Sequence, residues 1–129
     1  MQKDFDGWND VKKIVHKNVD RPFFHEREIW YCKLGLNVGY EQDGSGKGFL
    51  RPVVIIKKFN NNVCWILPLT KTKKTGKYYF SFSFTNETES TAILSQLRLL
   101  DVRRLSHHVG TISSADFSLL TKRLKELFP

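Results

Sequence analysis

Long apolar runs are missing from this chain of 129 residues. None reaches the roughly 18 consecutive apolar residues of a membrane-spanning helix, which excludes a membrane anchor of that kind. The first residues, Met-Gln-Lys-Asp, also lack the apolar core of a secretory signal. We therefore expect a cytoplasmic protein with no membrane partner.

Cysteine is scarce, with only two residues in the chain, Cys32 and Cys64. Both lie inside runs that have the composition of buried strands. Buried thiols in a reducing compartment normally stay unpaired. We expect two core thiols and no disulfide.

Motifs that hold metals or nucleotides are missing as well. The sequence has no Cys-x-x-Cys, no His-Glu-x-x-His and no carboxylate cluster. His107 and His108 are adjacent, so on a strand they would point to opposite faces and would not share an ion. The stretch 44–48 resembles a phosphate-binding loop, but Glu41 replaces its first glycine and Gly48 replaces its Ser or Thr. We expect no metal and no cofactor.

The chain does have an excess of basic residues. It contains 21 Lys and Arg and 13 Asp and Glu, which gives a formal charge of +8. Such an excess favours a polyanionic partner. The hydrophobic fraction of 40% is enough for one packed core. Residues 35–50 contain five glycines and predict a long loop, and residues 70–77 form a basic loop.

Short strands are predicted by aromatic and β-branched residues and by alternation. Residues 52–57 are almost continuously apolar, as in a fully buried strand, and the Asn triplet 60–62 should turn the chain back as a hairpin. Phe80, Phe82 and Phe84 alternate with small polar residues. The six predicted strands are 28–34, 52–57, 63–67, 79–85, 90–94 and 98–101.

Helices are predicted at both ends of the chain. Trp8, Val11, Val15 and Val19 lie near one helical face, with Ile14 beside them; Asp4 or Asp6 would cap this helix and Pro22 would stop it. Near the C-terminus, Ser113 begins a capping box with Asp116. One helical face then follows, formed by Phe117, Leu120, Leu124 and Leu127. These elements predict a mainly β fold (β+α), a small bent antiparallel sheet or barrel, with a helical extension at 1–24 and the main domain at 25–129.

Three residues beside the predicted loops suit the cleavage of RNA. The 2′-hydroxyl of RNA supplies the nucleophile, so a protein must orient it, neutralise charge on the phosphate and move protons. Arg51 ends the glycine-rich loop, and an arginine fork matches a phosphate. Thr70 follows the strand 63–67 and would lie near Arg51 in a hairpin, and its hydroxyl suits a phosphate oxygen. Glu41 lies in the loop, where a carboxylate suits proton transfer.

Several motifs in order resemble the MazF/PemK-type toxins of type II toxin–antitoxin systems, over about residues 26–128. They are Gly-Tyr-Glu-Gln (39–42), Arg-Pro-Val-Val-Ile-Ile (51–56), Leu-Pro-Leu-Thr (67–70), Gln-x-Arg-x-x-Asp (96–101) and Val-Gly-Thr-Ile-Ser (109–113). The extra residues between Glu41 and Arg51, and Arg27 in place of a usual glycine, depart from the family pattern.

This resemblance implies an SH3-like barrel with a C-terminal helix, acting as a homodimer and blocked by a cognate antitoxin protein. It also implies an endoribonuclease (mRNA interferase) that cuts single-stranded RNA or mRNA without metal, leaving a 2′,3′-cyclic phosphate and a 5′-hydroxyl. The family's catalytic positions fall on Arg51, Thr70 and Glu41. The positions expected to bind RNA are Tyr40, Gln42, Lys47, Lys71, Lys73, Lys74, Gln96 and Arg98.

Two other functions fit the same fold. One is a gyrase-targeting toxin like CcdB, which needs no paired Arg and Thr. The other is a non-catalytic barrel that binds RNA or a protein partner and leaves the RNA strand intact.

Overall fold

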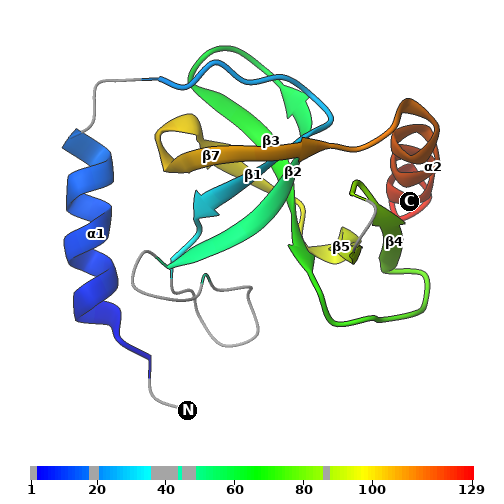
Figure 1. The fold of residues 1–129 in the computed structure, drawn as a ribbon, viewed down its shortest axis with the longest axis horizontal. Helices are drawn as coiled ribbons and strands as arrows, with labels where there is room; N and C mark the ends of the chain where they lie inside the picture. Colours follow the sequence, from blue (N-terminus) through cyan, green and yellow to red (C-terminus); the bar gives the residue numbers. More distant parts are fainter. Residues whose placement is uncertain (1–2, 18–20, 36–43, 45–48, 86–87) are drawn as a thin grey trace.

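The chain folds into one bent antiparallel sheet with a helix at each end (Figure 1), as seen in a computed structural model that describes residues 3–17, 21–35, 44, 49–85 and 88–129. This confirms the expected mainly β fold. The elements are α1 (Phe5–Lys17), β1 (Glu28–Lys33), β2 (Leu50–Lys58), β3 (Val63–Thr70), β4 (Tyr79–Ser83), β5 (Glu89–Ile93), η1 (Leu94–Gln96), β6 (Arg98–Asp101), η2 (Val102–Arg104), β7 (Leu105–Thr111) and α2 (Ser114–Lys125).

The long strand β3 joins the two parts of the sheet. The strand order is β4-β5-β3-β2-β1-β7, and β6 pairs with the first half of β3 while β5 pairs with its last residues. The predicted hairpin is confirmed as β2–β3, and the Asn60 side chain closes its turn by accepting bonds from the amides of Asn62 and Val63. The end of β2 and the beginning of β3 are therefore fixed against each other.

Apolar residues on the two faces of β2 enter two different cores. Val54 and Ile56 belong to a cluster with residues of β4, β5 and α2. Val53 and Ile55 belong to a second cluster with residues of β1, β3 and β6. Because strand side chains alternate between faces, a run that is apolar at every position must be covered on both sides.

One strand, β7, was not predicted, and the strand predicted over 79–85 ends at Ser83. Most of β7 is exposed, and only Leu105 is buried. It pairs with β1, where the rings of His108 and His107 stack on Trp30 and Tyr31. Its stability comes from this distant neighbour, which the local sequence pattern does not show.

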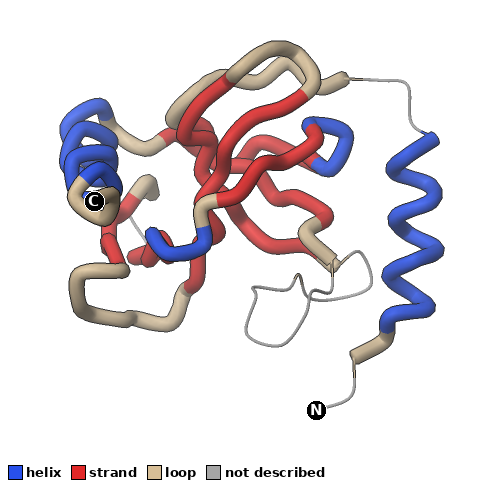
Figure 2. Tube along the Cα trace, turned by 180° about the vertical axis from the view of Figure 1, so that it is seen from behind, coloured by secondary structure: helices blue, strands red, loops and turns tan. Residues whose placement is uncertain are grey.

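The two helices lie on opposite sides of the sheet (Figures 1 and 2). Asp4 caps α1 by accepting a bond from the Gly7 amide at 2.9 Å, and Trp8 and Val15 are its buried residues. Ile14, which was predicted beside this apolar face, is 69% exposed, and Val19 lies outside the described residues. Among the described residues, no helix is both long and apolar enough to cross a membrane.

The C-terminal helix follows its prediction. Ser113 accepts a hydrogen bond from the Asp116 amide at 3.1 Å, which confirms the N-cap. Leu120 and Leu124 are buried, and Phe117 and Leu127 pack against the same core. The predicted helical face is therefore the one that covers the sheet.

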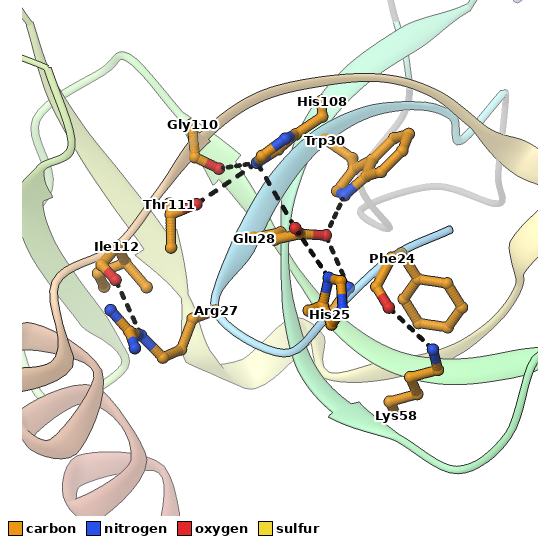
Figure 3. Close-up of polar contacts among 10 residues, drawn as sticks. All are labelled: Phe24, His25, Arg27, Glu28, Trp30, Lys58, His108, Gly110, Thr111 and Ile112. Atoms are coloured by element: carbon orange, nitrogen blue, oxygen red, sulfur yellow. Dashed lines mark hydrogen bonds and ion pairs between the residues drawn. The ribbon is translucent and has the colours of Figure 1, made fainter. Parts of the chain in front are cut away.

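Arg27 adopts a left-handed backbone conformation (φ +76°) just before β1. Its amide donates to the Ile55 carbonyl, and its carbonyl accepts from the Ile112 amide. The guanidinium adds a bond to the Ile112 carbonyl at 3.1 Å (Figure 3). The glycine expected here would adopt this conformation without strain. The three bonds hold the strained arginine between β2 and the segment after β7.

Glu28 occupies the centre of a polar cluster beside Arg27 (Figure 3). It accepts bonds from the His25 amide, the Trp30 indole and the His25 ring, and the His108 ring lies 4.0 Å away. Burial raises the pKa of Glu28, but these donors outweigh it and the pKa is lowered. These bonds tie β1 to the segment before it and place the His108 ring of β7 beside the same carboxylate.

Candidate functional site

Arg51 and Thr70 lie at the same end of the β2–β3 pair and on the same face of the sheet. Val53 pairs with Pro68, so continuing this register by two residues places Arg51 opposite Thr70. Alternation along each strand then puts both side chains on the face that carries the Val53 and Ile66 core. The predicted convergence of these two residues follows from the hairpin.

A hydrogen bond fixes the position of the Arg51 guanidinium. Its Nη1 donates to the Leu69 carbonyl at 3.1 Å, one residue before Thr70. Thr70 Oγ1 accepts a bond from the Thr72 amide at 3.2 Å, which uses an oxygen lone pair and not the hydroxyl hydrogen. A guanidinium and a hydroxyl donor at neighbouring positions can hold two oxygens of one phosphate.

The exposed basic loop that follows Thr70 carries Lys71, Lys73 and Lys74. Arg123 of α2 donates to the Gly76 carbonyl at 2.9 Å, and the Lys74 ammonium lies 5.6 Å from the centre of the Tyr79 ring. The loop is therefore attached to the sheet and to α2 near the end of β3. Its lysines can follow a phosphate chain that begins at Thr70.

Gln96 and Arg98 lie further back along β3. Gln96 ends η1 and is partly buried, and Arg98 pairs with Ile66. Ile66 is four residues before Thr70, about 13 Å along an extended strand. These two residues are therefore placed beside the same strand as Thr70, at a distance that suits flanking nucleotides.

The positive charges of three arginines oppose the effect of burial on the pKa of one thiol, that of Cys32. Burial raises the pKa of Cys32 to about 12, and Arg104, Arg98 and Arg51 act against this rise. Burial likewise raises the pKa of Cys64 to about 12. Neither thiol is a reactive nucleophile, and both are unpaired as predicted. Arg51 pairs with Cys32 across β1 and β2, and Arg104 donates to the carbonyl of the next residue, Lys33.

Arg104 lies near the candidate site and was not among the residues predicted for it. Burial lowers the pKa of its guanidinium, and repulsion from Arg98 lowers it further. It donates to the Lys33 carbonyl at 3.4 Å and lies 5.5 Å from the centre of the Trp8 ring. The only local signal for Arg104 in the sequence is the pair of adjacent arginines at 103–104. The short helix η2 places Arg104 near Arg98, and the sequence pattern does not show this.

The remaining predicted site residues lie outside the described residues. These are the loop acid Glu41 and the predicted RNA-binding residues Tyr40, Gln42 and Lys47. Among the residues that the structure does describe, no group of three His, Cys, Asp or Glu side chains is arranged to hold a metal ion.

The chain thus belongs to the class of small basic β proteins, with an arginine, a threonine and several lysines near one end of the strand β3. A family model for the PemK-like, MazF-like toxins of type II toxin–antitoxin systems matches residues 25–128. The chain belongs to this family.

Solved structures share the fold at low sequence identity. MazF from Deinococcus radiodurans matches with a TM-score of 0.68 and 16% identity, over 84% of this chain and 96% of that chain. The Mycobacterium tuberculosis toxin MazF-mt6 has a TM-score of 0.60 and 14% identity, over 78% and 94% of the two chains. An endoribonuclease in complex with its cognate antitoxin from a mycobacterial species has a TM-score of 0.61 and 13% identity, over 81% and 93%. A search of curated protein sequences finds no significant match.

Proposed function

We propose that this protein is an endoribonuclease toxin that cleaves single-stranded RNA, including mRNA, at a site formed by Arg51 and Thr70. The observation that carries the proposal is the bond from Arg51 to the Leu69 carbonyl, which holds the guanidinium beside Thr70. Family membership supports it, since relatives with the same fold are described as endoribonucleases.

The proposed reaction uses the RNA's own nucleophile. The 2′-oxygen forms a bond to phosphorus as the bond from phosphorus to the 5′-oxygen breaks. One proton leaves the 2′-hydroxyl and one is delivered to the departing 5′-oxygen. The products are a 2′,3′-cyclic phosphate and a 5′-hydroxyl, and no metal ion takes part.

Arg51 has the main role in this proposal. Its guanidinium stabilises the negative charge that builds on the non-bridging oxygens in the transition state. Thr70 donates its hydroxyl hydrogen to one of these oxygens. Arginine stays protonated at neutral pH and is a poor base, so Arg51 is not assigned as the base. Glu41 is the candidate for proton acceptor or, alternatively, an organiser of the loop, and the base is not assigned further.

Other predicted residues bind the RNA strand around this centre. Lys71, Lys73 and Lys74 follow the phosphates beyond Thr70, with Lys47 from the glycine-rich loop. Gln96 and Arg98 contact flanking nucleotides. Tyr40 stacks on a base, with Gln42 beside it.

The proposed partners are a second copy of the chain and an antitoxin protein. Phe59, Trp65 and Leu99 are 46%, 40% and 55% exposed, and Trp65 contacts Phe59 and pairs with Leu99. An exposed apolar patch of this kind favours a homodimer contact. The related structure of an endoribonuclease in complex with its cognate antitoxin supports an antitoxin partner; in this proposal the antitoxin covers the RNA surface. In this proposal residues 25–129 form the toxin domain and residues 1–24 an added segment.

One incubation tests the reaction. Purified full-length protein is mixed with mixed-sequence RNA and a chelator, and both ends of every fragment are mapped. We expect cyclic phosphate and 5′-hydroxyl ends, and no cleavage where a 2′-deoxynucleotide replaces the nucleotide at the mapped site. Fragments with 3′-hydroxyl ends, or inhibition of DNA gyrase with intact RNA, would overturn the proposal.

Thr70→Val tests the role of the hydroxyl, with Thr72→Val as the matched control. The first variant removes the proposed phosphate donor, while the second removes a hydroxyl two residues away and keeps the Thr72 amide bond. We expect a roughly tenfold to 100-fold slower cleavage for Thr70→Val only. Equal rates for the two variants would remove Thr70 from the mechanism.

A further inference from the structure

A cavity lies between α1 and η2, outside the proposed cleavage centre. Its volume is about 440 Å³, within the range of about 300–1,000 Å³ that is usual for small-molecule sites. One wall comes from α1, which precedes the residues that match the family model. The other wall comes from η2, which lies within them. This cavity is therefore a feature added to the family fold by the N-terminal helix.

Half of the ten residues that line the cavity are Lys or Arg, and the apolar side chains of Trp8 and Val15 lie among them. Five cationic side chains and one carboxylate line it, a net charge of +4: Lys12, Lys13, Lys17, Arg103, Arg104 and Asp101. The carboxylate is already used, because Asp101 binds the Arg103 guanidinium at 2.7 and 3.0 Å. The other four cationic residues line the cavity, and no second carboxylate is among its lining residues to pair with them. Such a cavity attracts an anion.

The two walls are joined by direct contacts. Arg103 Nη1 donates to the His16 carbonyl at 2.9 Å, so η2 holds one of the last carbonyls of α1. The Arg104 guanidinium lies 5.5 Å from the centre of the buried Trp8 ring. These contacts at both ends of the helix preorganise the cavity before any ligand enters.

Arg104 connects this cavity to the cleavage centre. It is partly buried, and among the described residues it forms no salt bridge, so an incoming anion would add a partner for its charge. Arg104, Arg98 and Arg51 all act on the Cys32 thiol. Arg104 also donates to the Lys33 carbonyl of β1, and the residue before Lys33, Cys32, pairs with Arg51 of β2. Arg104 and Arg51 therefore lie at the same end of the β1–β2 pair.

We propose that this cavity is a second phosphate-binding site, which takes a phosphodiester of the RNA strand outside the nucleotides that the cleavage centre holds. The inference rests on the proposed function, because it assumes that RNA is the ligand of Arg51. Because Arg104 lines the cavity and lies at the same end of the β1–β2 pair as Arg51, an extended polyanion bound at Arg51 can continue to the cavity, whereas a free nucleotide or an acidic peptide would need no such continuity. The N-terminal helix thereby adds affinity for longer RNA.

The test measures RNA binding by two matched double variants of the full chain. Lys13→Gln with Lys17→Gln removes two exposed charges from the cavity. Lys122→Gln with Lys125→Gln removes two exposed lysines at the end of α2 and serves as the control. The probe is a single-stranded RNA of mixed sequence with 2′-O-methyl groups, which supplies phosphates and cannot be cleaved by its own 2′-oxygen. Thermal unfolding confirms that each variant is folded.

We expect the cavity variant to bind roughly three- to tenfold more weakly than the wild type, and the control to bind within about twofold of it. The log–log salt slope should fall by about 0.7 for each phosphate that the variant no longer neutralises. In the wild type, the NMR signal of the Trp8 indole should shift on addition of RNA. Equal affinities for both variants would overturn the proposal, and so would an unshifted Trp8 signal.

Two further titrations identify the ligand. Adenosine monophosphate or poly-glutamate that shifts the Trp8 signal, where RNA does not, would assign the cavity to a free nucleotide or an acidic protein segment and refute the RNA assignment. Failure of the wild type to bind RNA at all would instead refute the proposed function. RNA binding that is insensitive to the lysines of α1 refutes this inference alone.

Discussion

Asp101 is the carboxylate that holds η2 and, through Arg103, the end of α1. Its oxygens accept the Arg103 guanidinium at 2.7 and 3.0 Å and the Arg103 amide at 2.9 Å. The side-chain bond from Arg103 lowers the pKa of Asp101 to about 2, from an ordinary value of 3.8. A fall of this size corresponds to about 2.5 kcal/mol of stability. Because the Asp101 side chain is 38% exposed, solvent screening reduces this to about 1 kcal/mol.

The sign of the pH dependence follows from the lowered pKa. The contribution is complete above about pH 5, where the unfolded carboxyl is ionised, and it is lost progressively as the pH falls toward 2. Asp101→Asn keeps an acceptor oxygen and removes the charge. We expect this variant to be about 1 kcal/mol less stable than the wild type at pH 6, with the difference shrinking toward pH 2.

Urea unfolding from pH 6 to pH 2 measures both quantities. Glu126→Gln, which removes an exposed carboxylate at the end of α2, is the matched control and should change stability by less than about 0.5 kcal/mol. A stability difference for Asp101→Asn that stays constant over this pH range would show that the ion pair contributes nothing through its charge.

Two further predictions concern the backbone before β1 and the core thiols. Arg27→Gly should be about 1 kcal/mol more stable than Arg27→Ala, because both lose the guanidinium bond but only alanine keeps the strain at φ +76°; equal unfolding midpoints would contradict this. Cys32 and Cys64 are fully buried with pKa values near 12, so iodoacetamide at pH 8 should label them only after denaturation. Rapid labelling of the native protein would refute the assigned burial.

The sequence predicted those parts of the fold that depend on local patterns. The apolar run at 53–56 indicated a strand buried on both faces, and its side chains do enter two cores. Ser113 marked the start of α2. The strand β7 has no such local pattern, because its pairing with β1 and its ring stacking on Trp30 and Tyr31 arise only in the folded chain.

In the candidate site, too, some residues could be predicted from the local sequence pattern and others could not. Arg51 and Thr70 were predicted to converge because a hairpin brings its two open ends together, and the register agrees. Arg104 was missed because its position depends on η2 and on the docking of α1. No periodicity in residues 1–24 shows which surface the helix covers, so the basic cavity could not be predicted.

The cleavage rate of Arg51→Ala tests the central claim most directly. The assay uses the full chain, an RNA with one mapped cleavage site and a chelator, and compares this variant with the wild type and with Lys125→Ala on α2. We expect Arg51→Ala to cleave at roughly one hundredth of the wild-type rate or less, with an unchanged fold, while the control cleaves normally. Cleavage by Arg51→Ala at the wild-type rate would contradict the claim.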